Sequence, residues 1–264
     1  MRAGAAILEV RSIGMRFGGV AALEDVTFAA RAGEVLGVLG PNGAGKTTLF
    51  NVISGLQAPT SGSVSLSGQS ITGRSTEHIA ALGLTRTFQT PVMFWGLSVR
   101  ESISLALDAG ERSGTFPPVF VRDLLPSAFG LRKSADRALA ARAAAALEGS
   151  PLASLADRPT ESLSFGEERL LEMARALAAG PKVLLLDEPL SGLNADEAHE
   201  VLQQVRVARE RGVAVLLVEH AVDELFSVAD RVVVLDHGKK IAEGTCAAVA
   251  ADRAVIDAYL GAEI

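Results

Sequence analysis

The chain has 264 residues, 48% of them hydrophobic, which is enough to bury a sizeable core in one large domain or two small ones. Its 31 acidic residues outnumber its 25 basic ones, so the net charge of −6 argues against a surface that coats nucleic acid and against a polybasic membrane patch. The single cysteine, Cys246, excludes an intrachain disulfide and is typical of a reducing cytosol. We predict a cytoplasmic globular protein with no nucleic-acid partner.

The start of the chain and its longest uncharged stretch give no sign of export or membrane insertion. Residues 1–10 lack the apolar core of a secretory signal and reach Glu9 too early. Residues 47–73 carry no charge but are broken by Asn51, Gln57, Pro59 and many Ser and Gly, whereas a membrane span needs about 20 apolar residues. We expect no transmembrane segment.

The first third of the chain has the pattern of short β segments, separated by the turn pairs Gly18-Gly19 and Ala32-Gly33. A helix is expected from Lys46 to Ser54, with Gly55 ending it. The strands of this region are expected over residues 7–13, 26–30, 34–39 and 63–68.

The middle of the chain, residues 77–148, changes character. Short helical patterns are mixed with prolines, and an Ala-rich helix over residues 135–148 has an N-cap in Ser134 and a stop in Gly149 and Pro151. We predict a mostly helical insertion, and we find no internal repeat.

Aliphatic runs return in the last third, over residues 183–187, 213–219 and 231–236, with helical stretches between them. Strands that alternate with helices predict a parallel sheet, and hence an α/β fold.

A further helix is expected to begin at LSFGE, because Ser164 and Glu167 have the spacing of a capping box. Apolar residues then follow one helical face, at Leu170, Leu171, Ala174, Leu177 and Ala178. A helix N-terminus offers unpaired amides and a partial positive charge, and Gly166 would leave those amides uncovered. This stretch therefore resembles an anion site, although the obvious phosphate loop lies more than a hundred residues earlier.

That phosphate loop is GPNGAGKT, which follows a predicted strand and opens a predicted helix, as the motif G-x-x-x-x-G-K-[ST] requires. Its glycines let backbone amides wrap a polyphosphate, Lys46 places a cation on the outer phosphates, and the Thr47 hydroxyl can bind Mg²⁺. The alternative, a simple glycine-rich turn, does not account for these flanks. The candidate nucleotide-binding residues here are Gly40, Pro41, Asn42, Gly43, Ala44, Gly45, Lys46, Thr47 and Thr48.

The acidic partner of this loop is LLLDEP, in which two carboxylates end an apolar strand at the edge where α/β sheets bind ligands. Asp187 is expected to hold the metal through water, and Glu188 to polarise the attacking water. Two merely solvated acids are the alternative. A charged residue rarely follows four buried aliphatic residues without a function, so we favour the catalytic interpretation.

With GPNGAGKT, LSFGE and LLLDEP in this order, nearly the whole chain resembles the ATP-binding subunit of an ATP-binding cassette (ABC) transporter. The resemblance implies a RecA-like P-loop NTPase core with a parallel sheet, an N-terminal antiparallel β subdomain and a helical subdomain insertion. Residues 1–264 would form one nucleotide-binding domain. Residues 1–90 and 155–264 would form the β subdomain and core, and residues 91–154 the helical subdomain.

The resemblance also implies roles for single residues. LSFGE lies where the family has its L-S-G-G-Q signature, so Ser164 and the Gly166 amide would face the γ-phosphate of ATP held by a second subunit. His220 resembles the switch histidine, Gln89 the glutamine that contacts Mg²⁺ or water, and Phe17 the aromatic that stacks on adenine. For Phe17, packing in the core is the alternative. Residues 191–194 (SGLN) lie where the family has its D-loop. The resemblance implies that the catalytic residues are Lys46, Glu188 and His220. It also implies that Thr47, Gln89 and Asp187 hold the metal.

A finer resemblance, to the ATP-binding subunits of branched-chain amino acid importers, rests on RTFQT, the aromatic in LSFGE, GLN, GKKIAEGT and VIDAYLG. Subunits for urea or short-amide import and for lipopolysaccharide export share several of these features and are the alternative. A soluble ABC ATPase acting on DNA or ribosomes would predict a long coiled coil, a duplicated cassette or a basic surface, and the sequence has none of them.

This resemblance implies partners: a transmembrane permease, a second ATP-binding subunit and, indirectly, a solute-binding protein. The chain would then lie on the inner face of the cell membrane through its permease. The apolar stretch Thr90–Leu97, which contains the only Trp, is a candidate permease contact, with ordinary core packing as the alternative.

Two departures from the family pattern bear on the site. Phe165 and Glu167 replace Gly and Gln of the signature, and Asn194 replaces the usual D-loop Asp. A carboxylate facing a triphosphate would be repelled by about 1 kcal/mol in water, and by more where it is desolvated. We therefore expect Glu167 to turn back and cap its own helix.

Overall fold

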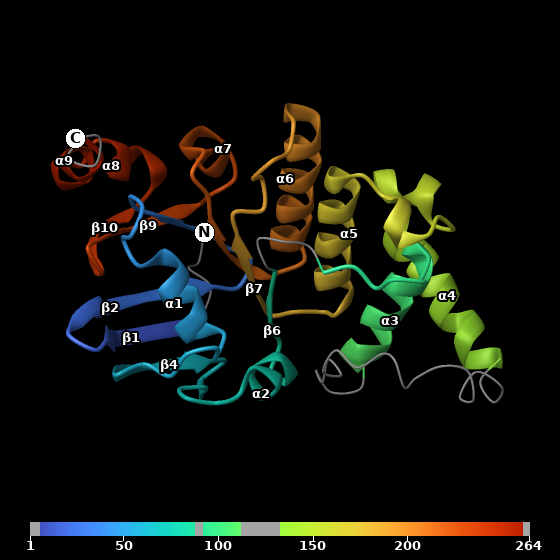
Figure 1. Ribbon diagram of the computed structural model, residues 1–264, viewed down its shortest axis with the longest axis horizontal. Helices are drawn as coiled ribbons and strands as arrows, with labels where there is room; N and C mark the ends of the chain where they lie inside the picture. The colour runs from blue at the N-terminus through green and yellow to red at the C-terminus, as the bar shows by residue number, and fades with distance from the viewer. Residues whose placement is uncertain (1–5, 88–91, 112–132, 261–264) are drawn as a thin grey trace.

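The computed structural model describes residues 6–87, 92–111 and 133–260, which form two sheets and the helices around them (Figure 1). Among these residues, none of the helices combines the length and apolar character needed to cross a membrane. The predicted Gln89 lies outside the described residues, as do Thr90 and Pro91 of the predicted permease contact.

The first sheet is antiparallel and has the strand order β2-β1-β4-β5. The segments predicted over residues 7–13 and 26–30 are parts of the longer strands β1 and β2. These two strands continue to a hairpin turn at Gly18-Gly19. The predicted strand over 63–68 begins two residues earlier and gives way to a turn at Ser67 and Gly68, both with positive φ. The strands are β1 (Ala6–Phe17), β2 (Val20–Arg31), β4 (Ser61–Leu66) and β5 (Gln69–Ser70).

The second sheet confirms the predicted parallel arrangement. Its order is β10-β9-β3-β8-β7-β6, and every neighbouring pair is parallel except the edge pair β10 and β9. All residues of β3, β7 and β8 are buried, as their aliphatic runs indicate. The strands are β3 (Val35–Leu39), β6 (Leu84–Arg86), β7 (Val183–Asp187), β8 (Ala214–Val218), β9 (Arg231–Asp236) and β10 (Lys239–Gly244).

Two hydrophobic cores cover the two faces of the parallel sheet. Successive residues of β7 alternate between them: Val183 and Leu185 pack with α1 and the antiparallel sheet, whereas Leu184 and Leu186 pack with α5 and α6. The fold is thus α/β with a separate antiparallel layer. The helices are α1 (Lys46–Ile53), α2 (Thr76–Ala81), α3 (Val99–Glu111), α4 (Lys133–Leu147), α5 (Phe165–Ala178), α6 (Ala195–Glu210), α7 (Val222–Phe226), α8 (Cys246–Ala250) and α9 (Arg253–Leu260), with 3₁₀ turns η3 (Pro151–Leu155) and η4 (Thr160–Ser162).

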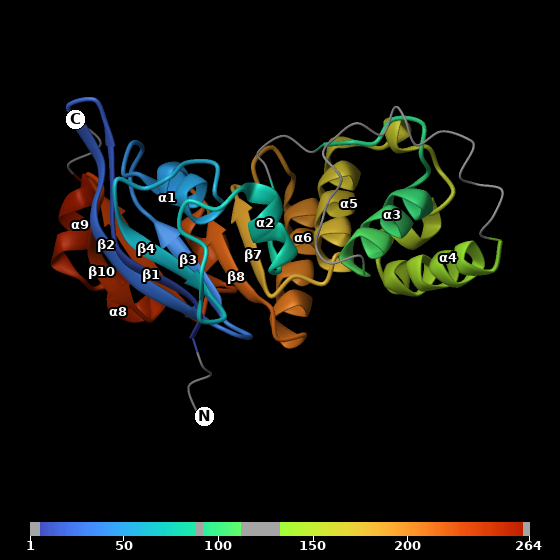
Figure 2. The same cartoon turned by 90° about the horizontal axis from the view of Figure 1, so that it is seen from below.

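Helices α3 and α4 lie at the end of the molecule opposite the antiparallel sheet, and α5 connects them to the core (Figures 1 and 2). The predicted Ala-rich helix is present as α4, but Ser134 is not its N-cap, since α4 begins at Lys133. A capping pattern fixes a helix end only to within a residue or two, and here the helical backbone starts earlier. At the other end, Gly149 adopts φ 76° and Ser150 caps η3, so the predicted stop is confirmed.

Candidate nucleotide-binding site

The phosphate loop connects the end of β3 to the start of α1, in the place that the motif predicts. Gly45 is the N-cap of α1 with φ 103°, and a Cβ there would lie 2.8 Å from the carbonyl oxygen of Ala22, so only glycine fits. Because glycine has no side chain, no side-chain hydrogen bond caps the helix. The first amides of α1 are therefore available to an anion.

Lys46 is buried at the mouth of this loop. Its Nζ donates hydrogen bonds to the carbonyl oxygens of Gly40 at 2.6 Å and Pro41 at 3.1 Å. Burial lowers the pKa of Lys46, while the negative charges of Glu188 and Asp187 act in the opposite direction. The fold thus brings the lysine and the predicted acidic pair together.

Asp187 ends β7, is 2% exposed and is held on one side only. Its Oδ2 pairs with Arg86 of β6 at 2.9 Å, and Arg86 also donates to Asn51 of α1 at 2.7 Å. Its Oδ1 is buried and has no hydrogen-bond partner among the described residues. Burying a carboxylate oxygen without a partner costs free energy, and such an oxygen is a suitable ligand for a hard divalent cation. With the Thr47 hydroxyl on α1, the residues present fit a Mg²⁺ ion.

Glu188 and His220 form a contact across the ends of β7 and β8. The Nε2 atom of His220 lies 2.8 Å from Oε1 of Glu188. Glu188 has φ 51°, a strained conformation for a residue with a side chain, and its amide donates to the Val218 carbonyl at 2.9 Å. Such strain is typical of functional sites, where the surrounding structure imposes it.

Sequence reasoning missed Glu219, which orders the backbone around this pair. Glu219 is 4% exposed; its Oε1 accepts the Leu190 amide at 2.7 Å, and its Oε2 accepts the His220 amide at 3.3 Å. Burial raises its pKa, and the two amide hydrogen bonds act in the opposite direction. The available signal was an acid at the end of an aliphatic strand, the pattern that revealed Asp187. Arg86 was missed as well, because its partners are distant in sequence.

Phe17 lies at the end of β1 and is 47% exposed, which excludes the alternative of core packing. The hairpin that follows it is close to the phosphate loop, since the Ala22 carbonyl faces Gly45. An exposed aromatic ring is a suitable stacking surface for a base.

The N-terminus of α5 has the predicted capping box. The Ser164 hydroxyl accepts the Glu167 amide at 3.3 Å, and the Glu167 carboxylate accepts the Ser164 amide at 2.7 Å. Arg158 adds an ion pair to Glu167 at 3.7 Å. The carboxylate is thus turned back onto its own helix, as expected.

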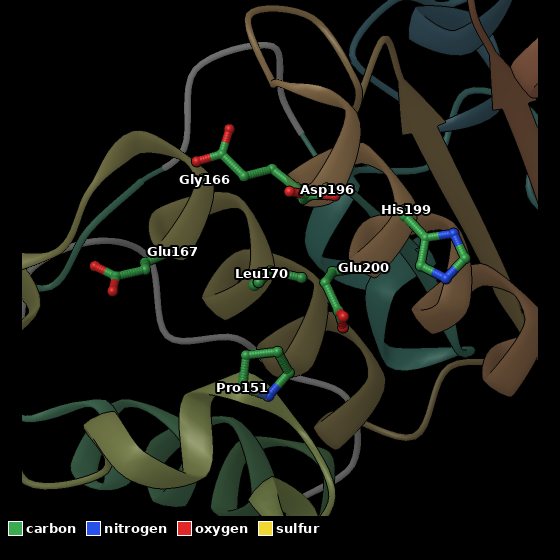
Figure 3. Close-up of a pocket in the computed structure, with 8 residues that line it drawn as sticks. Pro151, Gly166, Glu167, Leu170, Asp196, His199 and Glu200 are labelled. Atoms are coloured by element: carbon green, nitrogen blue, oxygen red, sulfur yellow. The ribbon is translucent and has the colours of Figure 1, made fainter.

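The packing around residue 166 explains why it is a glycine, and the sequence did not reveal this reason. Gly166 is buried, and a Cβ on it would overlap the side chain of Glu197, which caps α6 by accepting the Asn194 amide at 3.0 Å. Next to it is an open groove of about 350 Å³ between α5 and α6. Figure 3 shows Leu170 in this groove, with Glu167 and Glu200 on either side and Pro151 beyond them.

Within one chain, α5 lies away from the phosphate loop. Both views show α6 and the strands of the parallel sheet between α1 and α5 (Figures 1 and 2). The chain therefore brings together Lys46, Asp187, Glu188 and His220, but it does not bring Ser164 and Gly166 to them.

A phosphate loop between a parallel strand and a helix, with an aspartate and a glutamate ending a nearby strand, defines a P-loop nucleotide hydrolase. Comparisons with known proteins identify the family within this class. Residues 23–191 match the family model described as ABC transporter, and residues 239–264 match the model described as branched-chain amino acid ATP-binding cassette transporter.

The chain is 36% identical, over 256 residues, to the high-affinity branched-chain amino acid transport ATP-binding protein LivG of Salmonella typhimurium, covering 97% of this chain and 98% of the relative. It is also 36% identical, over 261 residues, to the corresponding protein BraF of Pseudomonas aeruginosa, with the same coverage. The structure superimposes on the ADP conformation of an ATP-binding cassette of an ABC transporter with a TM-score of 0.83 at 30% identity, covering 97% of this chain and 99% of that one.

The chain therefore belongs to the ATP-binding cassette family of transporter ATP-binding proteins. It is an ATPase of this family, and ATP is its nucleotide.

Proposed function

We propose that the chain powers a membrane importer of branched-chain or other hydrophobic amino acids. The relatives' names and the match of residues 239–264 to a branched-chain amino acid transporter model support this substrate class. The observation that carries the catalytic part is the contact of Glu188 with His220 beside buried Lys46 and Asp187.

In the proposed mechanism, the amides of residues 42–48 and the Lys46 ammonium hold the phosphates of ATP, and Phe17 stacks on the adenine. Glu188 orients the attacking water and accepts its proton, while His220 holds Glu188 and contacts the γ-phosphate. Thr47, Asp187 and Gln89 would hold Mg²⁺, which supplies charge neutralisation at the phosphates when bound.

We propose that two ATP-binding subunits share their sites, with Ser164 and Gly166 of each facing the γ-phosphate held by the other. The separation of α5 from α1 within one chain supports this arrangement. Closure around ATP and reopening after hydrolysis would drive transport. Within each subunit we assign residues 91–154 to a helical subdomain, and residues 1–90 and 155–264 to the β subdomain and core.

The permease contact is proposed around Trp95, whose 81% exposure argues against the alternative of core packing for this residue. Its neighbour Met93 packs against the core and anchors the segment. Docking there would hold the chain on the inner face of the membrane, with a solute-binding protein delivering the amino acid to the permease.

The test of the catalytic assignment is Glu188→Gln. The amide keeps the shape of the side chain but cannot accept a proton, so we expect turnover to fall by at least about a hundredfold while ATP affinity stays unchanged. Steady-state ATPase rates and binding of a fluorescent ATP analogue measure the two effects. Glu210→Gln, an exposed substitution on α6, is the matched control. Normal hydrolysis by Glu188→Gln would refute the assignment.

A further inference from the structure

The first residue of the phosphate loop contacts the last described helix of the chain. The amide of Gly40 donates a hydrogen bond to the hydroxyl oxygen of Tyr259 on α9 at 3.0 Å, across 219 residues of sequence. Tyr259 is partly buried against the core, and burial raises the pKa of its phenol, so the hydroxyl stays protonated at neutral pH.

The Gly40 peptide is held at both of its polar groups. Tyr259 accepts from its amide, and the ammonium group of Lys46 donates to its carbonyl oxygen at 2.6 Å. A Cβ on Gly40 would also overlap the carbonyl group of Leu235 in β9, so the backbone is enclosed there. The start of the loop is thus fixed by the C-terminal part of the chain as well as by its own lysine.

The contacts of Gly40 with Lys46 and with Tyr259 respond differently when nucleotide binds in the proposed mode. The Lys46 ammonium is the group that turns to the phosphates, and it then no longer donates a hydrogen bond to the Gly40 carbonyl oxygen. The hydrogen bond that the Gly40 amide donates to Tyr259 does not compete with the phosphates and can persist.

We propose that Tyr259 is a positioning residue of the phosphate loop, which keeps Gly40 in place when Lys46 turns from it to the nucleotide. This inference rests on the proposed role of the loop and assigns part of that role to the C-terminal segment.

The first test is Tyr259→Phe, which removes only the hydroxyl. Its loss destabilises the bound loop more than the free loop, where Lys46 still holds Gly40. One hydrogen bond corresponds to about two- to tenfold weaker binding of a fluorescent ATP analogue. We expect KM for ATP to rise by a similar factor with little change in kcat. Ile256→Ala, at an exposed position on the same helix, is the control and should bind as wild type does.

A purely structural hydroxyl would lower the melting temperature of Tyr259→Phe without changing its nucleotide affinity. That result would overturn the proposal.

The second test needs no substitution. Tyr259 is the only tyrosine of the chain, so labelling with fluorotyrosine gives a single ¹⁹F resonance. We expect this resonance to shift on addition of a non-hydrolysable ATP analogue, because Gly40, to which Tyr259 stays hydrogen-bonded, loses its contact with Lys46. The half-saturation should match that of the fluorescence titration. An unmoved resonance at saturation would overturn the role of Tyr259 and leave the proposed function intact. Failure of the unlabelled wild-type chain to bind the analogue would overturn the proposed function and this inference with it.

Discussion

Glu219 is the buried carboxylate on which the geometry of the proposed catalytic pair depends. It binds the Leu190 amide in the loop after Glu188 and the amide of His220, so one side chain connects both halves of the pair. Asp187 is supported in the same way by Arg86, which leaves one carboxylate oxygen for a cation. In both cases a residue outside the motifs sets the position of a residue inside them.

Glu219→Gln should change how stability depends on pH. Burial raises the pKa of Glu219, so the folded chain holds this proton more tightly than the unfolded chain does. The stability from this group is fully present below the ordinary carboxyl pKa of about 4.3 and is lost as the pH rises through the higher folded value. Glutamine does not titrate. The free energy of unfolding of the wild type, relative to Glu219→Gln, should therefore fall as the pH rises across this window.

Urea denaturation at a series of pH values measures this difference, with Glu210→Gln as the control for an exposed carboxylate. Parallel pH profiles of wild type and Glu219→Gln would contradict the expected coupling. The variant should also lower kcat, because glutamine offers only one acceptor oxygen where the carboxylate serves two amides.

Helices α5 and α6 approach each other at their N-termini through Gly166 and Glu197. Glu197 caps α6 from one side, and Gly166 makes room for it from the other. Phe165 stacks on Arg169 of its own helix, 5.5 Å from the ring centre, and its ring lies against Gly192. The signature stretch is thus packed directly against residues 191–194, which the family resemblance relates to the D-loop.

Gly166→Ala should destabilise the fold by about 1 kcal/mol. Alanine gains up to about 1 kcal/mol in helix propensity. It also forces Glu197 away and costs about 1–3 kcal/mol through crowding and the lost α6 cap. The second effect is the larger one. Chemical denaturation of Gly166→Ala, Glu197→Ala and the double variant forms the test, because in the absence of Glu197 the alanine should no longer destabilise. Equal costs in both backgrounds would contradict this explanation.

Trp95 lies on the surface, on a segment that is held in place through contacts of the preceding residue, Phe94. The Thr160 hydroxyl donates to the Phe94 carbonyl at 2.9 Å, and the buried guanidinium of Arg175 stacks on the Phe94 ring at 4.5 Å from its centre. Burial lowers the pKa of Arg175, with the charge of Glu172 acting in the opposite direction. An exposed tryptophan is typical of residues that dominate the energy of an interface.

Trp95→Ala should leave the ATPase rate of the isolated subunit within about twofold of wild type, because this residue lies outside the proposed nucleotide contacts. Loss of an interfacial tryptophan costs about 2 kcal/mol or more, so permease binding should weaken by at least about thirtyfold. Co-purification with the permease and permease-stimulated ATPase activity measure this loss. Leu56→Ala, at another exposed apolar residue, is the control. Normal assembly of Trp95→Ala would place the contact elsewhere.

The sequence by itself determined features that depend on local spacing. The phosphate loop between its strand and helix, the parallel sheet of aliphatic strands and the Ser164–Glu167 capping box all follow from residues close together in the chain, because hydrogen-bonding and burial periods act over a few positions. Helix ends were less certain, as Ser134 illustrates.

Only the tertiary structure decided the contacts between distant residues. Glu188 meets His220 across 32 positions, Arg86 meets Asp187 across 101, and Gly40 meets Tyr259 across 219. Such pairs depend on strand order and on how helices pack on the sheet, and no local period of the sequence encodes either.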